Sequence, residues 1–289
     1  MPKQNLKTAF VNGGYLAENQ AQVSIFDRGF LFGDGIYEVI AAIDGKLIDA
    51  NLHLARLDFS LAEIGMASPY SHAELITILH ELAERNQFEE GVLYMQFTRG
   101  VAPRAFNFPP EDVPITCVAF TLPMLLVDHP KAQTGVKVIS IPEQRWARRD
   151  IKSVNLLASC LGKQYASEQG AYEAIMIEDD FVTEGTSSTV YIVKQQKVIA
   201  RPLSRAVLPG VTRRALLTML KTQHAVELEE RKFTVDEVYS ADEVFITSAS
   251  NLVMPVVQID GHTVGNGKPG ELTKMLRNLY ITEAMASAI

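Results

Sequence analysis

The sequence predicts an α+β fold of two domains. Short β-rich segments joined by tight turns occur in both halves of the 289-residue chain, with amphipathic helical segments between them. The turns Asn12-Gly13-Gly14 and Asp44-Gly45 contain the glycines that hairpins between antiparallel strands favour. Residues 123–135 are rich in Pro, Asp and Gly, which is typical of a linker. We therefore expect domains of residues 1–126 and 127–289.

The first half is expected to form a mostly antiparallel sheet with two helices. Apolar residues at every third or fourth position after residue 51 predict a helix that Gly65 ends. Ser71 and Glu74 have the spacing of a capping box, which predicts the start of a second helix. Strands are expected at residues 7–11, 15–17, 37–43, 46–48, 92–98 and 115–122.

The second half is expected to consist mainly of strands joined by long loops. Its strands are expected at residues 136–141, 174–178, 190–193, 198–200, 243–247 and 256–259. Helices are expected at residues 155–168 and 212–221, with a short one from Thr234 and a final one from near Pro269.

Composition is typical of a globular protein and argues against several kinds of partner and location. Hydrophobic residues make up 47% of the chain and charged residues 21%, values of an ordinary globular protein. The net charge of −7 and the lack of long basic runs argue against a nucleic-acid partner. Cys117 and Cys160 lie in apolar runs, so both are expected to be buried thiols without a disulfide. No stretch reaches 18 apolar residues and no leader is visible, so a cytoplasmic protein without a membrane span is expected.

The common catalytic motifs of metal enzymes and serine hydrolases are missing, and the six histidines do not cluster as metal ligands. Four polar segments stand out instead. They are residues 27–35, residues 145–157 around Lys152, residues 182–189 around Glu184, and residues 208–213 before a helix. Each alone could be ordinary: a surface turn, a solvated lysine, a hydroxyl-rich turn or a helix start.

Together the four segments supply what pyridoxal 5'-phosphate (PLP) needs. Its aldehyde requires an amine such as Lys152, and its pyridine nitrogen requires a carboxylate such as Glu184. Its phosphate suits the N-terminus of the helix that begins near Thr212. The sequence therefore favours a PLP site.

Seven segments in order resemble the fold-type IV PLP enzymes, which include D-amino-acid aminotransferases, branched-chain aminotransferases and aminodeoxychorismate lyases. The segments are GDGIYEV, N-x-H-x-x-RL, TRG-x-x-PR, DIKSVNLL, YEAI, VTEGTSS and PGVTR, and they extend over most of the chain. DIKSVNLL and RGVAPRAF are most similar to D-amino-acid aminotransferases. The resemblance implies a smaller N-terminal α/β sandwich, a larger C-terminal pseudo-barrel domain that binds PLP, and a homodimer.

The resemblance also implies roles for individual residues. Lys152 would form the Schiff base and act as the general acid–base, and Glu184 would pair with the pyridine nitrogen. Tyr37 and Arg104 would bind the substrate carboxylate, with Arg104 reaching the other subunit's site. The remaining cofactor-binding residues would be Arg56, Ser187, Ser188, Val211, Thr212, Ser248 and Ala249.

One residue departs from the family pattern. In D-amino-acid aminotransferases, the arginine that binds the substrate carboxylate (Arg104 here) is usually followed two positions later by a histidine. This chain has Phe106 at that position. Because phenylalanine donates no hydrogen bond, carboxylate binding is expected to be weaker or differently arranged. A hydrogen bond to a charged group contributes roughly 1.5–3 kcal/mol, and that contribution would be lost. Phe106 is thus counted with the substrate-binding residues.

The expected activity is transfer of an amino group from an amino acid, D-alanine or a similar D-amino acid, to a 2-oxo acid. The alternatives are a 4-amino-4-deoxychorismate lyase that makes 4-aminobenzoate and pyruvate, which Phe106 and Phe108 could suit, and a branched-chain L-amino-acid aminotransferase. A binding protein that has lost catalysis is a further alternative, but Lys152 and Glu184 argue against it.

Overall fold

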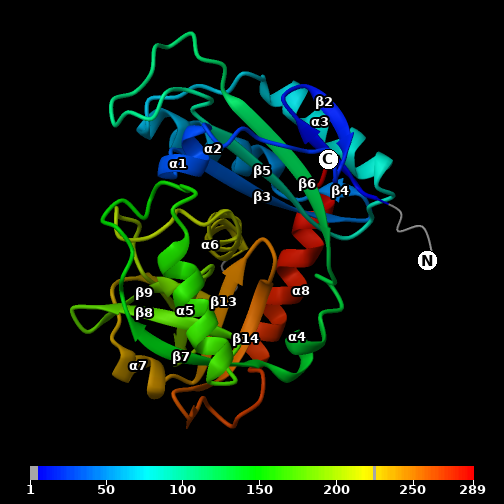
Figure 1. Cartoon of the computed structure of the whole chain (residues 1–289). Coiled ribbons are helices and arrows are strands. Elements are labelled where there is room, and N and C mark those ends of the chain that lie inside the picture. Colours follow the sequence, from blue (N-terminus) through cyan, green and yellow to red (C-terminus); the bar gives the residue numbers. More distant parts are fainter. Residues whose placement is uncertain (1–5, 224–225) are drawn as a thin grey trace. The chain divides into compact units, whose positions relative to one another are not determined.

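The computed structural model describes residues 6–223 and 226–289 (Figure 1). The chain divides into two compact units. Unit 1 comprises residues 1–125, 151–155 and 288–289, and unit 2 comprises residues 126–150 and 156–287. The segment that contains Lys152 therefore belongs to unit 1, although it follows 25 residues of unit 2 in the chain.

Unit 1 contains a six-stranded sheet in the order β2-β1-β6-β5-β3-β4, and every strand pair in it is antiparallel. Its strands are β1 (Thr8–Val11), β2 (Gly14–Ala17), β3 (Gly35–Ile43), β4 (Lys46–Leu47), β5 (Gly91–Thr98) and β6 (Thr116–Pro123). Its helices are α1 (Arg28–Phe32), α2 (Ala50–Glu63) and α3 (His72–Arg85). The antiparallel sheet predicted for the first half is thus present.

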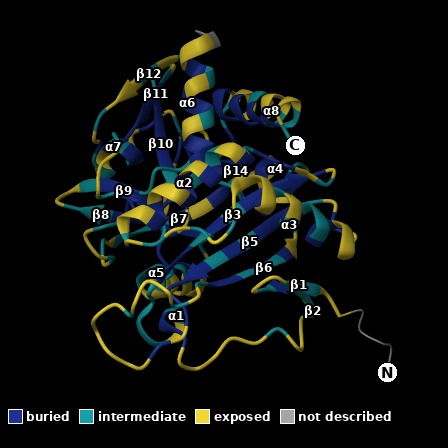
Figure 2. Cartoon of the chain, turned by 90° about the horizontal axis from the view of Figure 1, so that it is seen from above, coloured by how far each residue is buried: buried dark blue, intermediate teal, exposed yellow. Residues whose placement is uncertain are grey.

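The helices of unit 1 bury the predicted apolar stripes. Leu54, Leu57 and Leu61 of α2 are fully or almost fully buried and join one core with β3 and β5. Figure 2 shows these two strands mostly in the colour of buried residues. Ser71 and Glu74 form the predicted capping box at the start of α3.

Unit 2 contains a nine-stranded sheet in the order β12-β11-β10-β13-β14-β7-β8-β9, with β15 added beside β14. Its strands are β7 (Val136–Pro142), β8 (Glu173–Glu178), β9 (Phe181–Gly185), β10 (Thr189–Lys194), β11 (Lys197–Ala200), β12 (Glu227–Glu230), β13 (Glu243–Ser248), β14 (Leu252–Ile259) and β15 (His262–Thr263). Its helices are α4 (Pro130–Thr134), α5 (Leu157–Glu168), α6 (Val211–Gln223), α7 (Val235–Tyr239) and α8 (Glu271–Ala286).

The sheet of unit 2 curls because β9, at one end of the strand order, also contacts β10. Helix α8 packs on β14, α6 packs on β13, and α5 packs on β7 and β8. Figure 1 shows α8 running beside β13 and β14. The predicted α+β fold with a sandwich-like and a half-barrel unit is confirmed by the two sheets and by the structural neighbours described below.

The structure adds local detail that the sequence did not predict, and it contradicts one prediction. Asp27 caps a short helix, α1, within the segment 27–35. The linker 123–135 contains another short helix, α4, whose first residue is Pro130. Glu184 lies on a strand, β9. Cys117 is buried as expected, but Cys160 is exposed because the apolar residues around it do not face the core.

Two glycines with positive φ test how tightly the sheet of unit 1 is packed. Gly91 (φ 140°) begins β5, and a Cβ there would overlap the carbonyl oxygen of Leu122 and lie 2.8 Å from the amide nitrogen of Met124. Gly45 (φ 71°) lies in the β3–β4 turn, with open space around its missing Cβ. We expect Gly91→Ala to destabilise the protein by about 3 kcal/mol and Gly45→Ala by about 1 kcal/mol.

Urea denaturation of both variants measures this difference. Equal losses at the two positions would contradict the packing of β5 against β6, because backbone strain alone would then account for both effects.

Candidate active site

Lys152 is held by backbone hydrogen bonds in unit 1. Its carbonyl oxygen accepts from the amide of Tyr37 at 3.0 Å, and its amide donates to the hydroxyl of Ser60 at 3.2 Å. Ser153 forms a bridge with Ile36 of β3. The main chain of Lys152 is thus fixed to the edge of β3 and to α2.

The side chain of Lys152 is partly exposed, and its ammonium lies 4.2 Å from the ring centroid of Tyr37. No carboxylate forms an ion pair with this ammonium among residues 6–223 and 226–289. Tyr37 in turn stacks on Tyr94, with ring centroids 5.5 Å apart. The structure therefore brings together two of the predicted site residues, a lysine amine on a fixed backbone and an aromatic ring.

Arg56, predicted to bind phosphate, is buried on α2 and is engaged by Glu38. Its Nε and Nη2 each donate to one carboxylate oxygen at 2.8 Å. His53 contacts the same carboxylate at 2.8 Å. Burial alone would raise the pKa of Glu38, but the charge of Arg56 and the hydrogen bonds hold that pKa well below its ordinary value. Burial also lowers the pKa of His53.

Arg104 and Phe106, predicted to bind substrate, lie on the exposed loop between β5 and β6. Phe106 is 84% exposed and packs against Phe32, with ring centroids 5.7 Å apart. Arg28 holds this loop, because its Nη1 donates to the carbonyl oxygens of Ala105 at 2.6 Å and of Asn107 at 3.3 Å. Sequence reasoning had no signal for this contact.

Arg28 and Arg99 share one acidic partner. Nε of Arg28 pairs with Asp34 at 2.7 Å, and Arg99 pairs with the same carboxylate at 2.9 Å. The guanidinium of Arg99 lies 3.6 Å from the ring centroid of Phe108. Two buried arginines therefore hold the loop that contains Arg104, through contacts with the residues that follow it.

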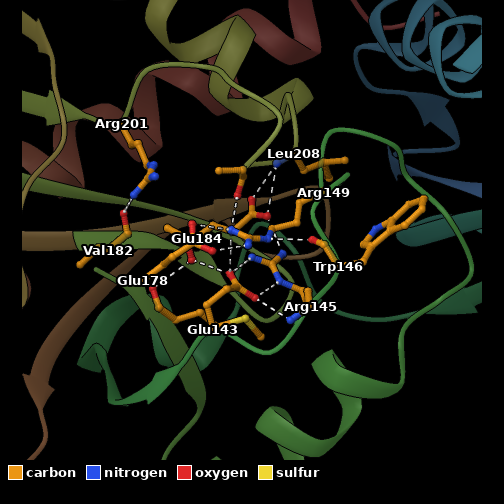
Figure 3. Close-up of polar contacts among 12 residues, drawn as sticks. Glu143, Arg145, Trp146, Arg149, Glu178, Val182, Glu184, Arg201 and Leu208 are labelled. Carbon is orange, nitrogen blue, oxygen red and sulfur yellow. Dashed lines mark hydrogen bonds and ion pairs between the residues drawn. The ribbon is translucent and has the colours of Figure 1, made fainter. Parts of the chain in front are cut away.

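Glu184, the predicted partner of the pyridine nitrogen, lies in unit 2 and is 4% exposed. Its Oε1 accepts from Nη1 of Arg145 at 2.5 Å, and both of its oxygens accept from the amide of Leu208, at 3.2 and 3.1 Å. Figure 3 shows Arg145 between the carboxylates of Glu184 and Glu143. One arginine therefore serves two acidic side chains.

The second of these carboxylates is the more strongly bound. Glu143 accepts from Nε and Nη2 of Arg145 and from the hydroxyl of Thr183. Arg149 lies 3.6 Å from Glu143 and pairs with Glu178 at 2.5 Å. The result is an alternating row of acidic and basic side chains that leads from Glu184 to Glu178 (Figure 3).

The two carboxylates that share Arg145 differ in acidity. Burial raises the pKa of Glu184, and the charge of Arg145 and its hydrogen bonds offset this only in part. Burial opposes ionisation of Glu143 too, but its hydrogen bonds and its charge pairing with Arg145 lower its pKa to about 2. Glu184 is therefore a buried carboxylate that a further cation would stabilise, which fits a protonated pyridine nitrogen.

Ser187 and Ser188 follow β9, and both donate to Glu173, at 3.1 and 3.3 Å. Val211 and Thr212 are the first residues of α6 and are buried. Gly210 lies just before them, and a Cβ on it would lie 2.9 Å from the Thr189 hydroxyl. A larger residue at position 210 would therefore require its neighbours to shift. The first backbone N–H groups of a helix bind phosphate readily, so the start of α6 fits the phosphate of PLP.

The last two predicted cofactor residues, Ser248 and Ala249, lie where β13 ends. The Ser248 hydroxyl lies 3.2 Å from the Ser250 hydroxyl and accepts from the amide of Asn251 at 3.2 Å. This tight turn presents backbone N–H groups and hydroxyls, which suits an anionic ligand.

The structure thus gathers the predicted residues in two sets. Lys152, Tyr37, Arg56, Arg104 and Phe106 belong to unit 1, and the other seven belong to unit 2. Sequence reasoning missed Glu38, Arg145 and Glu173. The signal was present, since Glu38 and Glu173 are acidic residues inside the apolar segments IYEVIAAI and YEAIMI.

Two other kinds of site find no support in the described residues. No group of His, Cys, Asp or Glu there could hold a metal ion. None of the helices that the structure describes is long and apolar enough to cross a membrane.

Comparison with known proteins identifies the family. The sequence model of amino-transferase class IV matches residues 35–259. The chain belongs to this family. It is 44% identical over 276 residues to D-alanine aminotransferase of Bacillus licheniformis, covering 94% of this chain and 96% of that protein. It is 40% identical over 277 residues to D-alanine aminotransferase of Staphylococcus haemolyticus, covering 94% and 97%.

Solved structures agree on the fold. The branched-chain amino acid aminotransferase of Escherichia coli superposes with a TM-score of 0.86 at 21% identity, covering 96% of this chain and 95% of that one. A second branched-chain amino acid aminotransferase, solved with pyridoxamine 5'-phosphate, gives a TM-score of 0.87 at 23% identity, covering 97% and 95%. The branched-chain aminotransferase of Thermoproteus uzoniensis, solved with norvaline, gives 0.85 at 23% identity, covering 97% and 95%. The prediction of a PLP-dependent aminotransferase of fold-type IV is confirmed at the level of the family.

The low pKa of Glu143 predicts a specific loss of stability in acid. Its pKa is about 2 in the folded protein against an ordinary 4.5, so its stabilising contribution is complete above pH 4.5 and is lost as the pH falls towards 2. We expect on the order of 3 kcal/mol, since one pKa unit corresponds to about 1.4 kcal/mol. Glu143→Gln should therefore flatten the fall of unfolding free energy between pH 5 and pH 3 (roughly the upper part of that window).

Urea denaturation of the cofactor-free protein at several pH values measures this slope. Glu168→Gln, which changes an exposed carboxylate of α5, serves as the matched control and should keep the parent slope. If Glu143→Gln keeps it too, then Glu143 is not the group that responds.

Proposed function

We propose that this chain transfers the amino group of D-alanine, or of a similar D-amino acid, to a 2-oxo acid with PLP bound at Lys152. The observation that carries the proposal is the 44% identity to a D-alanine aminotransferase over nearly the full length of both chains. The buried carboxylate of Glu184 and the helix start at Val211 support the same cofactor.

When bound, PLP supplies an aldehyde for amines and an electron-accepting ring. The amine of Lys152 would hold the cofactor, and its Nζ would accept and return the proton of the substrate. Glu184 would pair with the protonated ring nitrogen, and Arg145 holds the Glu184 carboxylate in place. Tyr37, beside Lys152, and Arg104 bind the substrate carboxylate.

The phosphate of PLP would be bound by two kinds of group. Backbone N–H groups at Val211, Thr212 and Ala249, with the hydroxyls of Thr212 and Ser248, supply neutral donors. Arg56 supplies positive charge while Glu38 fixes the orientation of its guanidinium.

A homodimer belongs to the same proposal. Arg104 and Phe106 lie on an exposed loop, and a second copy of the chain would give these side chains a site to complete. The two-domain boundary after residue 126 and a cytoplasmic location also remain predictions.

A half-reaction assay tests the activity. We expect D-alanine to convert the absorbance band of the bound cofactor to that of its amine form, with release of one pyruvate, and Lys152→Ala to lose this conversion. Borohydride reduction followed by peptide mapping should label Lys152. Faster conversion by L-leucine would favour a branched-chain aminotransferase, and 4-aminobenzoate from aminodeoxychorismate would favour the lyase; either result would overturn the proposal.

Substitutions in the exposed loop test the carboxylate trap. Arg104→Lys should raise the KM for D-alanine at least about tenfold, because lysine cannot form the two-bond fork of a guanidinium with a carboxylate. The spectrum of the bound cofactor should not change. Phe106→His should lower that KM if a missing donor limits binding.

Arg85→Lys is the control for Arg104→Lys, since Arg85 is exposed on α3 and pairs with Glu81. It should leave all kinetic constants unchanged. A parent KM in Arg104→Lys would rule out Arg104 as the trap. A flat D-alanine response in Phe106→His would instead assign Phe106 to the wall of the substrate pocket.

A further inference from the structure

Glu173 is a carboxylate buried inside an apolar strand. It begins β8, is 0% exposed, and precedes three buried apolar residues. Burial of an isolated charge costs several kcal/mol or more unless donors surround it. The nearest cation is Lys163, whose ammonium lies 3.5 Å away and whose side chain is 43% exposed. A single solvated ion pair does not account for a carboxylate at this position.

Hydroxyl groups surround Glu173 instead. Oε1 accepts from the amide of Ala174 at 2.9 Å and from the hydroxyl of Thr186. Oε2 accepts from the hydroxyls of Ser187 at 3.1 Å and Ser188 at 3.3 Å, next to the Lys163 ammonium. Every one of these contacts directs a donor at the carboxylate.

The loop after β9 is built to turn these hydroxyls inward. The amide of Gly185 donates to the carbonyl oxygen of Ser188 at 2.6 Å, and the amide of Thr186 donates to the carbonyl oxygen of Ala174 at 3.0 Å. A Cβ on Gly185 would overlap the Ser188 hydroxyl and lie 3.3 Å from Cγ of Glu173. Glycine at this position is therefore what allows Ser188 to reach Glu173.

This arrangement decides whether the two serine hydroxyls donate or accept hydrogen bonds on their other side. A hydroxyl has one proton to donate and two lone pairs to accept with, and an ionised carboxylate only accepts. While Ser187 and Ser188 donate hydrogen bonds to Glu173, each hydroxyl can offer only lone pairs to another group. Such oxygens suit an N–H group and repel the oxygens of phosphates and carboxylates.

We propose that Glu173 is a positioning residue of the PLP site. It engages the hydroxyl hydrogens of Ser187 and Ser188 in hydrogen bonds, so that both serine oxygens accept from an amine or ammonium. The proposal rests on the proposed function, because it takes these serines to lie along the cofactor. It assigns them to the reacting nitrogen atoms and excludes them from the phosphate cradle. The buried negative charge behind the hydroxyls favours the protonated form of that nitrogen.

The variant Glu173→Gln tests this polarity. The amide of Ala174 fixes an acceptor at Oε1, so the glutamine oxygen should occupy that position and its NH2 group should face the two serines. The serines must then accept from the glutamine and donate outward. We expect the pKa at which the absorbance band of the holoenzyme's cofactor changes with pH to fall by about one unit.

The affinity of the cofactor-free enzyme for PLP should change less than about threefold, because the phosphate donors are untouched. Glu243→Gln is the matched control. Glu243 is also a carboxylate of unit 2 with hydroxyl and N–H donors, from Thr273 and Leu272, but outside the site. It should lose stability without moving the band's pKa.

A double-mutant cycle keeps the test decisive if Glu173→Gln folds poorly. Ser187→Ala with Ser188→Ala should lower the band's pKa in the same direction. Glu173→Gln should lower it less in that background than in the parent, because only the direct effect of its charge is then left to lose. An unchanged band pKa in both variants would overturn the inference. Failure of the proposed function is recognised separately, because the parent protein would then not transaminate D-alanine, whatever Glu173 does to the spectrum.

Discussion

A carboxylate removed from water must be surrounded by donors, and the residues predicted for the site are grouped around three such carboxylates, one in unit 1 and two in unit 2. Glu38 is held by Arg56 and His53, Glu173 by hydroxyls, and Glu184 by Arg145 and a backbone amide. Each fixes side chains that the proposed chemistry needs. Since a buried charge left without partners costs several kcal/mol, the geometry around each carboxylate has little freedom.

The three carboxylates are not equally satisfied, and the difference is informative. Glu38 has a bidentate arginine to itself, and its pKa lies well below the ordinary value. Glu184 must share Arg145 with Glu143, which takes more of its donors, and the pKa of Glu184 is raised. A cation next to Glu184 would restore the balance, so binding of a protonated pyridine nitrogen and ionisation of Glu184 should favour each other.

Sequence reasoning succeeded where periodicity or a motif had one physical meaning. The stripe of Leu54, Leu57 and Leu61 could only face a core, and Ser71 with Glu74 formed the expected capping box. It failed where the signal was non-local. Helix α1 is a single turn capped by Asp27, too short for a periodic pattern, and Cys160 lies in an apolar run that the core does not use.

The same reason explains which site residues were missed. Lys152 and Glu184 could be named because PLP chemistry demands an amine and a carboxylate. Apart from the amide of Ala174, Glu173 contacts side chains that become its neighbours only after folding. They are Lys163, earlier in the chain, and three hydroxyl residues 13 to 15 positions further along it. Local sequence cannot supply such partners, although an acidic residue inside an apolar strand already signals that they must exist.

The division of the chain has a kinetic meaning. Unit 1 is finished by residues 151–155, which include Lys152, and by Ile289, whose backbone pairs with Leu47 of β4. Those contacts join residues more than 90 and more than 200 positions apart, and such long loops are slow to close. During synthesis the first unit to emerge therefore waits for distant parts of the chain. Lys152 is therefore placed only after all the helices and strands of unit 1 have been made.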